Sequence, residues 1–413
     1  MVGVSRFSAR TSWDVGESSY AAAVRGARAA GRQLYDLTIS NPTRCGFSYD
    51  AEELLGVLGD ARALMYDPDP RGMRIAREAV AGYYAGHEAE VGVGDLVLTT
   101  STSESYSFLF RLLCDPGDEV LVAQPSYPLF DFLADLDDVR LRPYPLFYDH
   151  GWWIDFAELE RAITARTRAV IVVHPNNPTG HWTGATEREQ LEALCARHGL
   201  ALIVDEVFLD YPLQECCAPQ SKDAAARSFA CGEHPALTFV LSGLSKIAGL
   251  PQMKAAWIAT LGPERARAEA LGRLEVVADT FLSMNAPVQL AMGTWLAGAG
   301  KMQRQILERA RGNLGRLQRM AEEEPGRLQV LQVDAGWSAV VALPGCVGEV
   351  DCAERLVRKR GVVVHPGGFY GMAERSRVVV SLIGLSGEFE AGIRRATLEL
   401  STEERLQVLD ELK

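Results

Sequence analysis

The feature of the sequence that most constrains the fold is a series of short apolar runs alternating with helix-like stretches. The runs are nearly continuous, which is typical of strands buried on both faces of a sheet. Stretches with helical periodicity lie between them, at about residues 73–84, 103–113 and 187–198. The apolar runs occupy residues 96–100, 119–123, 169–173, 201–205, 237–241 and 255–260. This pattern predicts an α/β fold with a mostly parallel sheet flanked by helices.

The length of the chain predicts more than one domain, because 413 residues exceed what one hydrophobic core usually supports. After Pro287 the pattern changes to a mostly helical stretch over residues 288–323, interrupted weakly at residues 298–300, followed by mixed strands and a last helix at 388–400. We therefore expect an N-terminal arm over residues 1–48 that packs with the small domain, and a large domain over 49–287. Residues 288–413 are expected to form a long connecting helix and a small α+β domain.

Composition narrows the class of protein. Hydrophobic residues make up 47% and charged residues 23%, as in an ordinary soluble globular protein. The net charge of -12 argues against a nucleic-acid or anionic-membrane partner. No membrane span or signal peptide is predicted, so a cytoplasmic location is expected. The eight cysteines are scattered without a CxxC pair, which favours free thiols over disulfides, and no metal site is expected.

Lys246 is the first candidate for chemistry. It follows the apolar run 237–241 and precedes the turn formers Gly249 and Pro251, and it is one of only six lysines. At the end of a buried strand its amine would be held rigidly and still be reachable. Burial favours the neutral amine, which can form an imine with an aldehyde. The alternative is an ordinary surface lysine on a loop.

Polar and aromatic residues follow three other predicted strands, where ligands bind in open α/β sheets. Thr102 and Ser103 open a helix and suit a phosphate, although Ser103 could simply cap that helix. Tyr127 lies on a proline-rich turn and could stack on a planar ligand or belong to the core. Asn177 lies in a loop constrained by two prolines and a glycine, and its side chain can donate a hydrogen bond.

Two adjacent carboxylates end the run 201–205. Asp205 at a buried strand end needs a partner, and a protonated ring nitrogen of a ligand would serve. A helix cap or a salt bridge would also satisfy it. Glu206 follows directly, and strand alternation decides which of the two side chains points inward.

Taken together and in this order, these motifs resemble the class I/II aminotransferase family, which are pyridoxal-phosphate-dependent enzymes of fold type I. The similarity covers nearly the whole chain. The motifs that carry it are Tyr66 to Gly72, Ser103-Glu104, Pro125 to Pro128, Asn177 to Gly180, Asp205-Glu206 and Ser245-Lys246 with Gly249 to Pro251.

The resemblance implies roles for these residues. Lys246 would hold the cofactor as an imine and move a proton at the substrate Cα, Asp205 would pair with the pyridine nitrogen, and Tyr127 would stack on the ring. Tyr66 would reach the phosphate of the neighbouring subunit in a homodimer with shared sites. The remaining cofactor ligands would be Asn177, Thr102, Ser103, Ser245 and Lys254, and the substrate would be bound by Ser40, Asn177 and Arg377.

The sequence departs from the family pattern around the cofactor. Phe208 stands where the family usually has a tyrosine, so the cofactor's phenolate oxygen would lose one donor. Lys254 replaces the arginine that binds phosphate, and a lysine offers charge without a bidentate fork. Gly243 stands where many relatives have serine, so Ser242 or Ser245 would have to supply any hydroxyl there.

A further departure concerns the substrate carboxylate, which relatives bind with an arginine in the last domain. Aligning Ser381 with the family's serine places Val379 at that position, and sliding the register places Arg377 there instead. Arg377 is the predicted ligand. If it is not, the substrate lacks a free carboxylate or another arginine binds it.

The predicted function is an aminotransferase that moves an amino group between an amino acid and a 2-oxo acid by a ping-pong route. A lyase on the same scaffold is the alternative, since small changes around the cofactor select the reaction. A non-catalytic ligand-sensing domain is disfavoured, because no basic helix precedes the large domain. A nicotinamide dehydrogenase fails because Gly92-Val-Gly-Asp95 is not GxGxxG and precedes a strand. Trp13, Trp182 and Tyr370 could line a substrate pocket, but the interpretation as core or surface aromatics is favoured.

Overall fold

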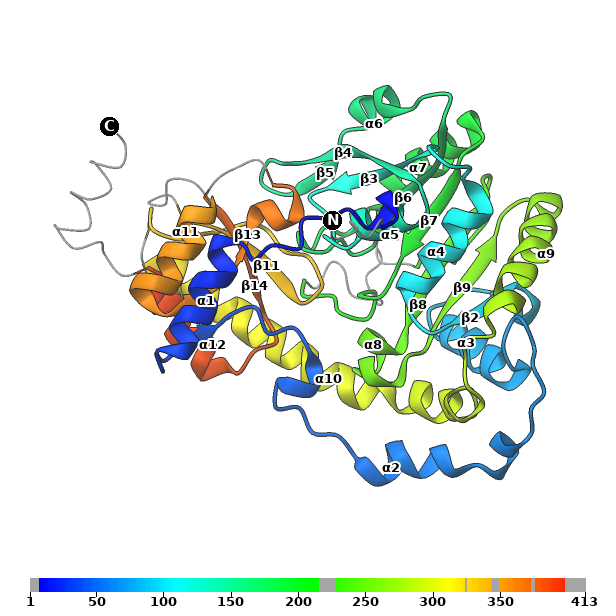
Figure 1. Cartoon of the computed structure of the whole chain (residues 1–413), viewed down its shortest axis with the longest axis horizontal. Helices are drawn as coiled ribbons and strands as arrows, with labels where there is room; N and C mark the ends of the chain where they lie inside the picture. Colours follow the sequence, from blue (N-terminus) through cyan, green and yellow to red (C-terminus); the bar gives the residue numbers. More distant parts are fainter. Residues whose placement is uncertain (1–6, 215–227, 324, 344–348, 373–375, 398–413) are drawn as a thin grey trace, which may run out of the picture.

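The computed structural model describes residues 7–214, 228–323, 325–343, 349–372 and 376–397. It shows a large part built on one wide sheet and a smaller part built on a short sheet, joined by one long helix (Figure 1). Among the described residues, no helix has both the length and the apolar character needed to cross a bilayer.

The large sheet has eight strands in the order β2-β9-β8-β7-β6-β3-β4-β5. The central strands β8, β7, β6, β3 and β4 run parallel to one another, whereas β2 and β8 pair antiparallel with β9 and β5 pairs antiparallel with β4. The prediction of a mostly parallel sheet is confirmed. The strands are β2 (Leu96–Thr99), β3 (Glu119–Gln124), β4 (Arg140–Tyr148), β5 (Trp152–Ile154), β6 (Thr167–Val173), β7 (Ala201–Asp205), β8 (Thr238–Gly243) and β9 (Ala256–Leu261).

The strands β4 and β5 were not expected from the sequence. β4 contains Pro143 and Pro145 and begins with exposed Arg140, so it lacks the continuous apolar run of the other parallel strands. Proline is tolerated near a sheet edge, where one side of the strand has no ladder to complete. Only tertiary pairing with β3 and β5 reveals β4 as a strand.

Helices cover both faces of this sheet, and strand alternation divides its side chains between two cores. In β9, Trp257 packs in the core on one face and Ile258 in the core on the other. The first face is covered by α3 (Arg74–Gly86), α6 (Phe156–Ala162), α7 (Ala185–His198) and the first part of α10 (Ala286–Glu323). The second face is covered by α4 (Thr102–Leu113), α5 (Phe130–Leu136) and α9 (Glu264–Phe281).

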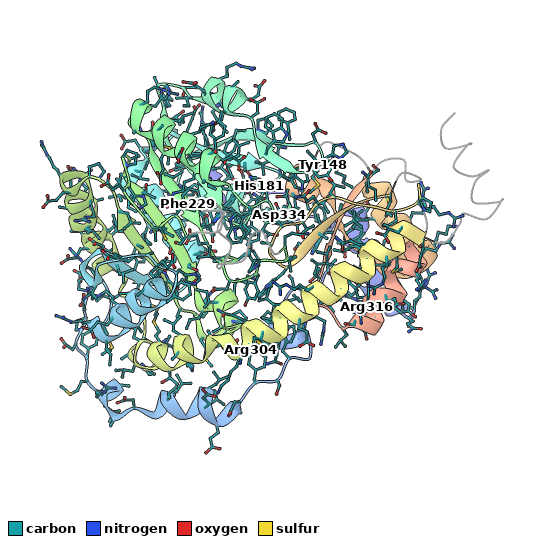
Figure 2. The ribbon with its side chains drawn as sticks, turned by 180° about the vertical axis from the view of Figure 1, so that it is seen from behind. Tyr148, His181, Phe229, Arg304, Arg316 and Asp334 are labelled. Atoms are coloured by element: carbon teal, nitrogen blue, oxygen red, sulfur yellow. The ribbon has the colours of Figure 1, made fainter. Side chains whose placement is uncertain are left out.

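Helix α10 runs unbroken for 38 residues, so the predicted interruption at residues 298–300 is wrong. A glycine inside a helix costs only about 1 kcal/mol relative to alanine. The buried side chains of Trp295, Ala299 and Met302 offset that cost at this point. The helix begins against the large sheet and ends in the core of the small part, and Arg304 and Arg316 mark its course in Figure 2.

The small part is built on an antiparallel sheet of four strands in the order β10-β11-β14-β13. The N-terminal arm contacts it, because β1 (Tyr35–Asp36) pairs with β12 (Val362–Val363) and α1 (Ser19–Ala29) contacts α11 (Glu349–Arg355). The other elements are β10 (Gln329–Val330), β11 (Ser338–Ala342), β13 (His365–Pro366), β14 (Arg377–Ser381) and α12 (Ser386–Ala396), with α2 (Ala51–Gly56) and α8 (Leu244–Ile247) in the large part.

Among the described residues, Cys352 is the cysteine that differs from expectation. Cys45, Cys114, Cys195 and Cys231 are free thiols, as predicted. Cys352 is disulfide-bonded, so the prediction of free thiols is wrong there. Spacing along a sequence does not show which distant cysteines meet in the fold.

Candidate active site

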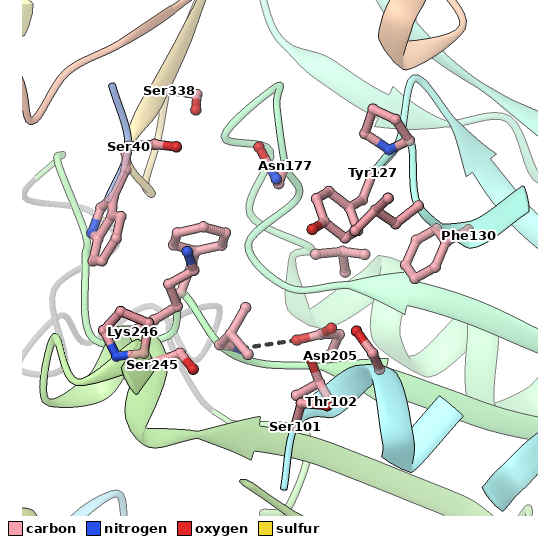
Figure 3. Close-up of a pocket in the computed structure, with 18 of the residues that line it drawn as sticks. Ser40, Ser101, Thr102, Tyr127, Phe130, Asn177, Asp205, Ser245, Lys246 and Ser338 are labelled. Carbon is pink, nitrogen blue, oxygen red and sulfur yellow. Dashed lines mark hydrogen bonds between the residues drawn. The ribbon is translucent and has the colours of Figure 1, made fainter. Parts of the chain in front are cut away.

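A cavity of about 500 Å³ lies where the carboxyl ends of the central strands face the small sheet. Figure 3 shows that its labelled side chains come from both the large and the small part. Residues after four neighbouring strands meet here because parallel strands end at the same sheet edge. The predicted site residues that line the cavity are Ser40, Thr102, Ser103, Tyr127, Asn177, Asp205, Ser245, Lys246 and Lys254.

Lys246 lies on the short helix α8, directly after β8. Its Nζ atom lies 4.9 Å from the centre of the Trp337 ring and 5.5 Å from the centre of the Phe208 ring. Burial lowers the pKa of this amine, and the nearby Asp205 opposes the shift. The hydroxyl of buried Tyr211 donates a hydrogen bond to the backbone carbonyl of Lys246 and fixes the turn.

Asp205 ends β7 and presents a buried carboxylate to the cavity. Its Oδ1 accepts a hydrogen bond from the Val207 N–H at 3.1 Å, and its Oδ2 accepts one from the Tyr106 hydroxyl at 3.2 Å. Burial raises the pKa of Asp205 to about 6, against these two hydrogen bonds and the Lys246 charge. A positively charged ligand atom beside the carboxylate would relieve this desolvation.

Glu206 points away from the cavity, so Asp205 is the one of the two adjacent carboxylates that faces a ligand. Its carboxylate accepts hydrogen bonds from the Ser228 hydroxyl at 2.7 Å and from the Phe229 N–H at 2.5 Å. Successive residues at a strand end face opposite sides of the sheet. Asp205 is therefore the carboxylate available to a ligand.

The amino end of α4 forms another part of the cavity wall. Ser101 caps this helix by accepting a hydrogen bond from the Glu104 N–H at 3.2 Å, so the alternative interpretation of Ser103 as the cap is wrong. Thr102 and Ser103 are thereby placed in the first turn, where helix N–H groups have no partner inside the helix. Together with Ser245 and Lys254, this end of the cavity suits a phosphate.

Tyr127 and Asn177 line the cavity from the loops after β3 and β6. The Tyr127 ring meets Phe130 edge to face, with centroids 5.8 Å apart and an interplanar angle of 87°. In Figure 3 both side chains lie on the far side of Asp205 from Ser101. The ring and the amide are available for stacking and for hydrogen bonding with a planar ligand.

Two predicted residues lie elsewhere. Arg377 does not line the cavity; its guanidinium carbon lies 5.5 Å from the Trp152 ring centre and 5.9 Å from that of Tyr148. Val379, two residues along β14, lines the cavity instead. Tyr66 is 83% exposed and lines a separate hollow of about 240 Å³. Their predicted roles stay predictions, and the placement of Arg377 does not favour its role.

Several lining residues were missed by sequence reasoning because they belong to the small part and carry no motif. Trp337, Ser338 and His365 line the cavity, as does Tyr370, which was interpreted as structural. The other two aromatics are structural: Trp182 packs against His174, and Trp13 packs against Phe132. Trp337 and Ser338 at the start of β11 match no functional motif, so no feature of the sequence indicated that they belong to the site.

The cavity fits pyridoxal phosphate by the chemistry of its donors. An amine whose pKa is lowered suits an aldehyde, a buried carboxylate suits a protonated ring nitrogen, and a helix amino end with hydroxyls and a lysine suits a phosphate.

Comparisons with known proteins identify the family of this chain. The family model "Aminotransferase class I and II" matches residues 21–383. The chain is 29% identical over 269 residues to glutamate-pyruvate aminotransferase AlaA of Escherichia coli K12. These residues make up 65% of this chain and 64% of that protein. It is also 29% identical over 322 residues to alanine aminotransferase of Mycobacterium tuberculosis H37Rv. The aligned region makes up 77% of this chain and 68% of that protein.

Solved structures show the same fold. Alanine aminotransferase from Pyrococcus furiosus superposes with a TM-score of 0.82 at 19% identity, over 98% of this chain and 100% of that one. A Thermus thermophilus aspartate aminotransferase double mutant superposes with a TM-score of 0.79 at 22% identity, over 95% and 99%. With a family model matched over most of its length, the chain belongs to the class I and II aminotransferase family.

Proposed function

We propose that this protein is a pyridoxal-phosphate-dependent aminotransferase that moves an amino group between an amino acid and a 2-oxo acid by a ping-pong route. The observation that carries the proposal is the joint placement of the Lys246 amine and the Asp205 carboxylate on one cavity that also holds the amino end of α4. The relatives named alanine and glutamate-pyruvate aminotransferase support the choice of substrates.

When bound, pyridoxal phosphate supplies an aldehyde that reacts with amines and a conjugated ring that accepts an electron pair released at the substrate Cα. Burial lowers the pKa of Lys246 and so favours the neutral Nζ, the form that can take the Cα proton. Its backbone is held by Tyr211, which limits the positions that the amine can reach.

The other side chains bind and orient. Asp205 would stabilise positive charge on a ring nitrogen, while its hydrogen bonds with Tyr106 and the Val207 N–H hold the carboxylate in place. Tyr127 would cover one ring face. Asn177 would donate to a ring oxygen. The aromatic rings of Phe208 and Trp337 exclude water beside the amine.

The phosphate would bind at the amino end of α4 with Thr102, Ser103, Ser245 and Lys254. Lyase chemistry is not favoured by any of the named relatives. A homodimer with Tyr66 reaching the partner's phosphate and a cytoplasmic location stay predictions.

A direct test is reconstitution with pyridoxal phosphate, followed by borohydride reduction and peptide mass spectrometry. The expected result is a label on the peptide that contains Lys246. The Lys246→Ala variant should lose both the label and activity, whereas Lys359→Ala, a matched change at a lysine outside the cavity, should keep both. A label on another lysine would contradict the proposal.

The reaction class is tested by adding an amino donor to the reconstituted protein without an acceptor. Transamination converts the bound cofactor to its amine form in one turnover, and a 2-oxo acid should reverse the absorbance change. Steady release of ammonia and a 2-oxo acid from the donor, with no stoichiometric conversion, would indicate elimination instead.

A further inference from the structure

The wall of the cavity contributed by the N-terminal arm and the small sheet differs in charge from the opposite wall. Lys246 and Lys254 belong to the large part. Of the described residues that line the cavity from the arm and the small sheet, none is a lysine or an arginine. A substrate carboxylate facing this wall would therefore have no fixed cation beside it among those residues.

The course of β14 explains why the described residues of this wall include no cation. Residues 377, 379 and 381 share one face of the strand because side chains alternate. Val379 and Ser381 occupy the part of that face that lines the cavity, and Val379 is 1% exposed. Arg377 lies at the end of the strand, with its guanidinium against the rings of Tyr148 and Trp152.

The titratable groups near this wall do not replace the missing cation. Burial lowers the pKa of His365, although Asp36 and a hydrogen bond with Thr38 oppose the shift, and this direction favours the neutral ring. Thr38 donates a hydrogen bond to the Asp36 carboxylate at 2.5 Å. The charge that acts on His365 is the Asp36 carboxylate, which also pairs with Arg28 at 3.1 Å.

Neutral hydrogen-bonding groups are present instead. Ser40, Ser338 and Ser381 line this wall, and in Figure 3 Ser40 and Ser338 lie on the opposite side of the cavity from Thr102. Hydroxyls donate to and accept from carboxamides and alcohols. Burying a carboxylate without a cation beside it has a large unfavourable desolvation free energy. The burial of an uncharged carboxamide or alcohol of the same shape is less unfavourable.

We propose that the preferred amino donor carries an uncharged hydrogen-bonding group, a carboxamide or a hydroxymethyl group, in place of the carboxylate next to its amine, and that Val379 sets this preference. The inference rests on the proposed amino-group transfer and narrows its substrates. Because both half-reactions of a ping-pong route use this one cavity, a 2-oxo acid meets the same wall and is expected to react more weakly than the corresponding 2-oxo amide. Free amino acids react more weakly, through the same Lys246, with their carboxylate facing Val379, Ser338 and Ser381.

The test compares matched donors in single-turnover conversion of the reconstituted protein. The pairs are alanine and alaninamide, serine and serinamide, and phenylalanine and phenylalaninamide, with the corresponding amino alcohols as a third series. The amides or alcohols are expected to exceed the free acids by at least about tenfold in the apparent second-order rate constant of this conversion, which corresponds to about 1.4 kcal/mol. A preference for the free acids would overturn the inference while leaving the proposed function intact.

Variants at β14 identify the cause. Val379→Arg should shift the acid-to-amide ratio toward the acids by at least about tenfold, because an arginine pairs bidentately with a carboxylate. Val379→Leu, which adds bulk without charge, should keep the preference for neutral donors. Arg377→Gln should leave the ratio unchanged; loss of acid turnover in this variant would show that Arg377 turns into the cavity, and would overturn the inference.

Binding supplies a second measurement that does not depend on turnover. Propanamide should compete with the donor at lower concentration than propanoate, and calorimetry with the reconstituted protein should show the same order. Tighter binding of propanoate would overturn the inference. If no donor of any series converts the cofactor, the proposed aminotransferase function itself fails and the inference fails with it.

Discussion

Asp205 and Glu206 are neighbours in sequence, yet their carboxylates lie on opposite sides of the end of β7. Asp205 faces the cavity and bonds with Tyr106, whereas Glu206 faces the core and bonds with Ser228 and the Phe229 N–H. Burial raises the pKa of both, to about 6 for Asp205 and about 7 for Glu206. The two residues share a chemical type and a desolvation cost, and only one of them is placed to meet a ligand.

Replacing Asp205 with asparagine should remove function while replacing Glu206 with glutamine should not. Asp205→Asn leaves a protonated ring nitrogen unpaired in a buried site, which costs about 3 kcal/mol or more and lowers kcat/KM by at least about 100-fold. Glu206→Gln changes a side chain outside the cavity and keeps an acceptor oxygen for the Phe229 N–H, so it should change kcat/KM by less than about threefold. Steady-state kinetics with saturating cofactor measures both; equal effects would contradict this assignment.

The same pair predicts how stability depends on pH without cofactor. Both carboxyls have a pKa above the ordinary value of about 4 in the folded protein, so the folded state binds more protons than the unfolded state in this window. Their contribution to stability is fully present below about pH 4 and is lost as pH rises through about 7. Glu206→Gln should therefore melt a few degrees higher than wild type at pH 8, with a smaller difference at pH 5.5.

Scanning calorimetry or fluorimetry of the cofactor-free protein at the two pH values provides this comparison. Ser228→Ala is the matched control, because it removes a hydrogen bond to Glu206 and leaves the carboxylate titratable. It should melt lower than wild type and still show a pH dependence, displaced to higher pH because the Ser228 hydrogen bond lowers the pKa of Glu206. A Glu206→Gln variant with the wild-type pH dependence would show that Glu206 is not the responsible group.

Phe208 tests the departure from the family pattern around the cofactor. The ring is buried, lines the cavity and lies 5.5 Å from the Lys246 Nζ. Phe208→Tyr adds a hydroxyl that can donate to a ring oxygen of the cofactor and stabilise the deprotonated form of the bound chromophore. The pKa of its absorbance titration should fall by about one unit in the variant. Phe208→Leu lacks the donor and should show no such fall; an unchanged pKa in Phe208→Tyr would refute the prediction.

Tyr66 tests the predicted sharing of sites between two subunits. Its side chain is 83% exposed and does not line the cavity of its own chain. Tyr66→Ala and Lys246→Ala should each be nearly inactive. After the two are unfolded and refolded together, random pairing in a two-fold dimer restores one complete site in each mixed dimer, about a quarter of the wild-type sites. Mixed samples that stay inactive would contradict the shared site.

The large sheet and the lysine could be predicted because local pattern determines them. Buried parallel strands need continuous apolar runs, and the residues that follow them meet at one edge whatever the details of packing. Lys246, Asp205, Asn177, Tyr127 and the residues that open α4 therefore come together as predicted from their positions in the chain. The proline-containing strand β4 could not be predicted in this way, because it is identified by its pairing with β3 and not by its composition.

Tertiary structure alone decided what faces the cavity from the opposite side. Trp337, Ser338, His365 and Val379 lie 91 or more residues after Lys246 in the chain, and the unbroken helix α10 carries the chain from one wall of the cavity to the other. Whether Arg377 or Val379 reaches the ligand depends on where the alternating face of β14 meets the cavity. The packing of the two sheets against each other determines this, and the alternation of side chains along one strand carries no information about that packing.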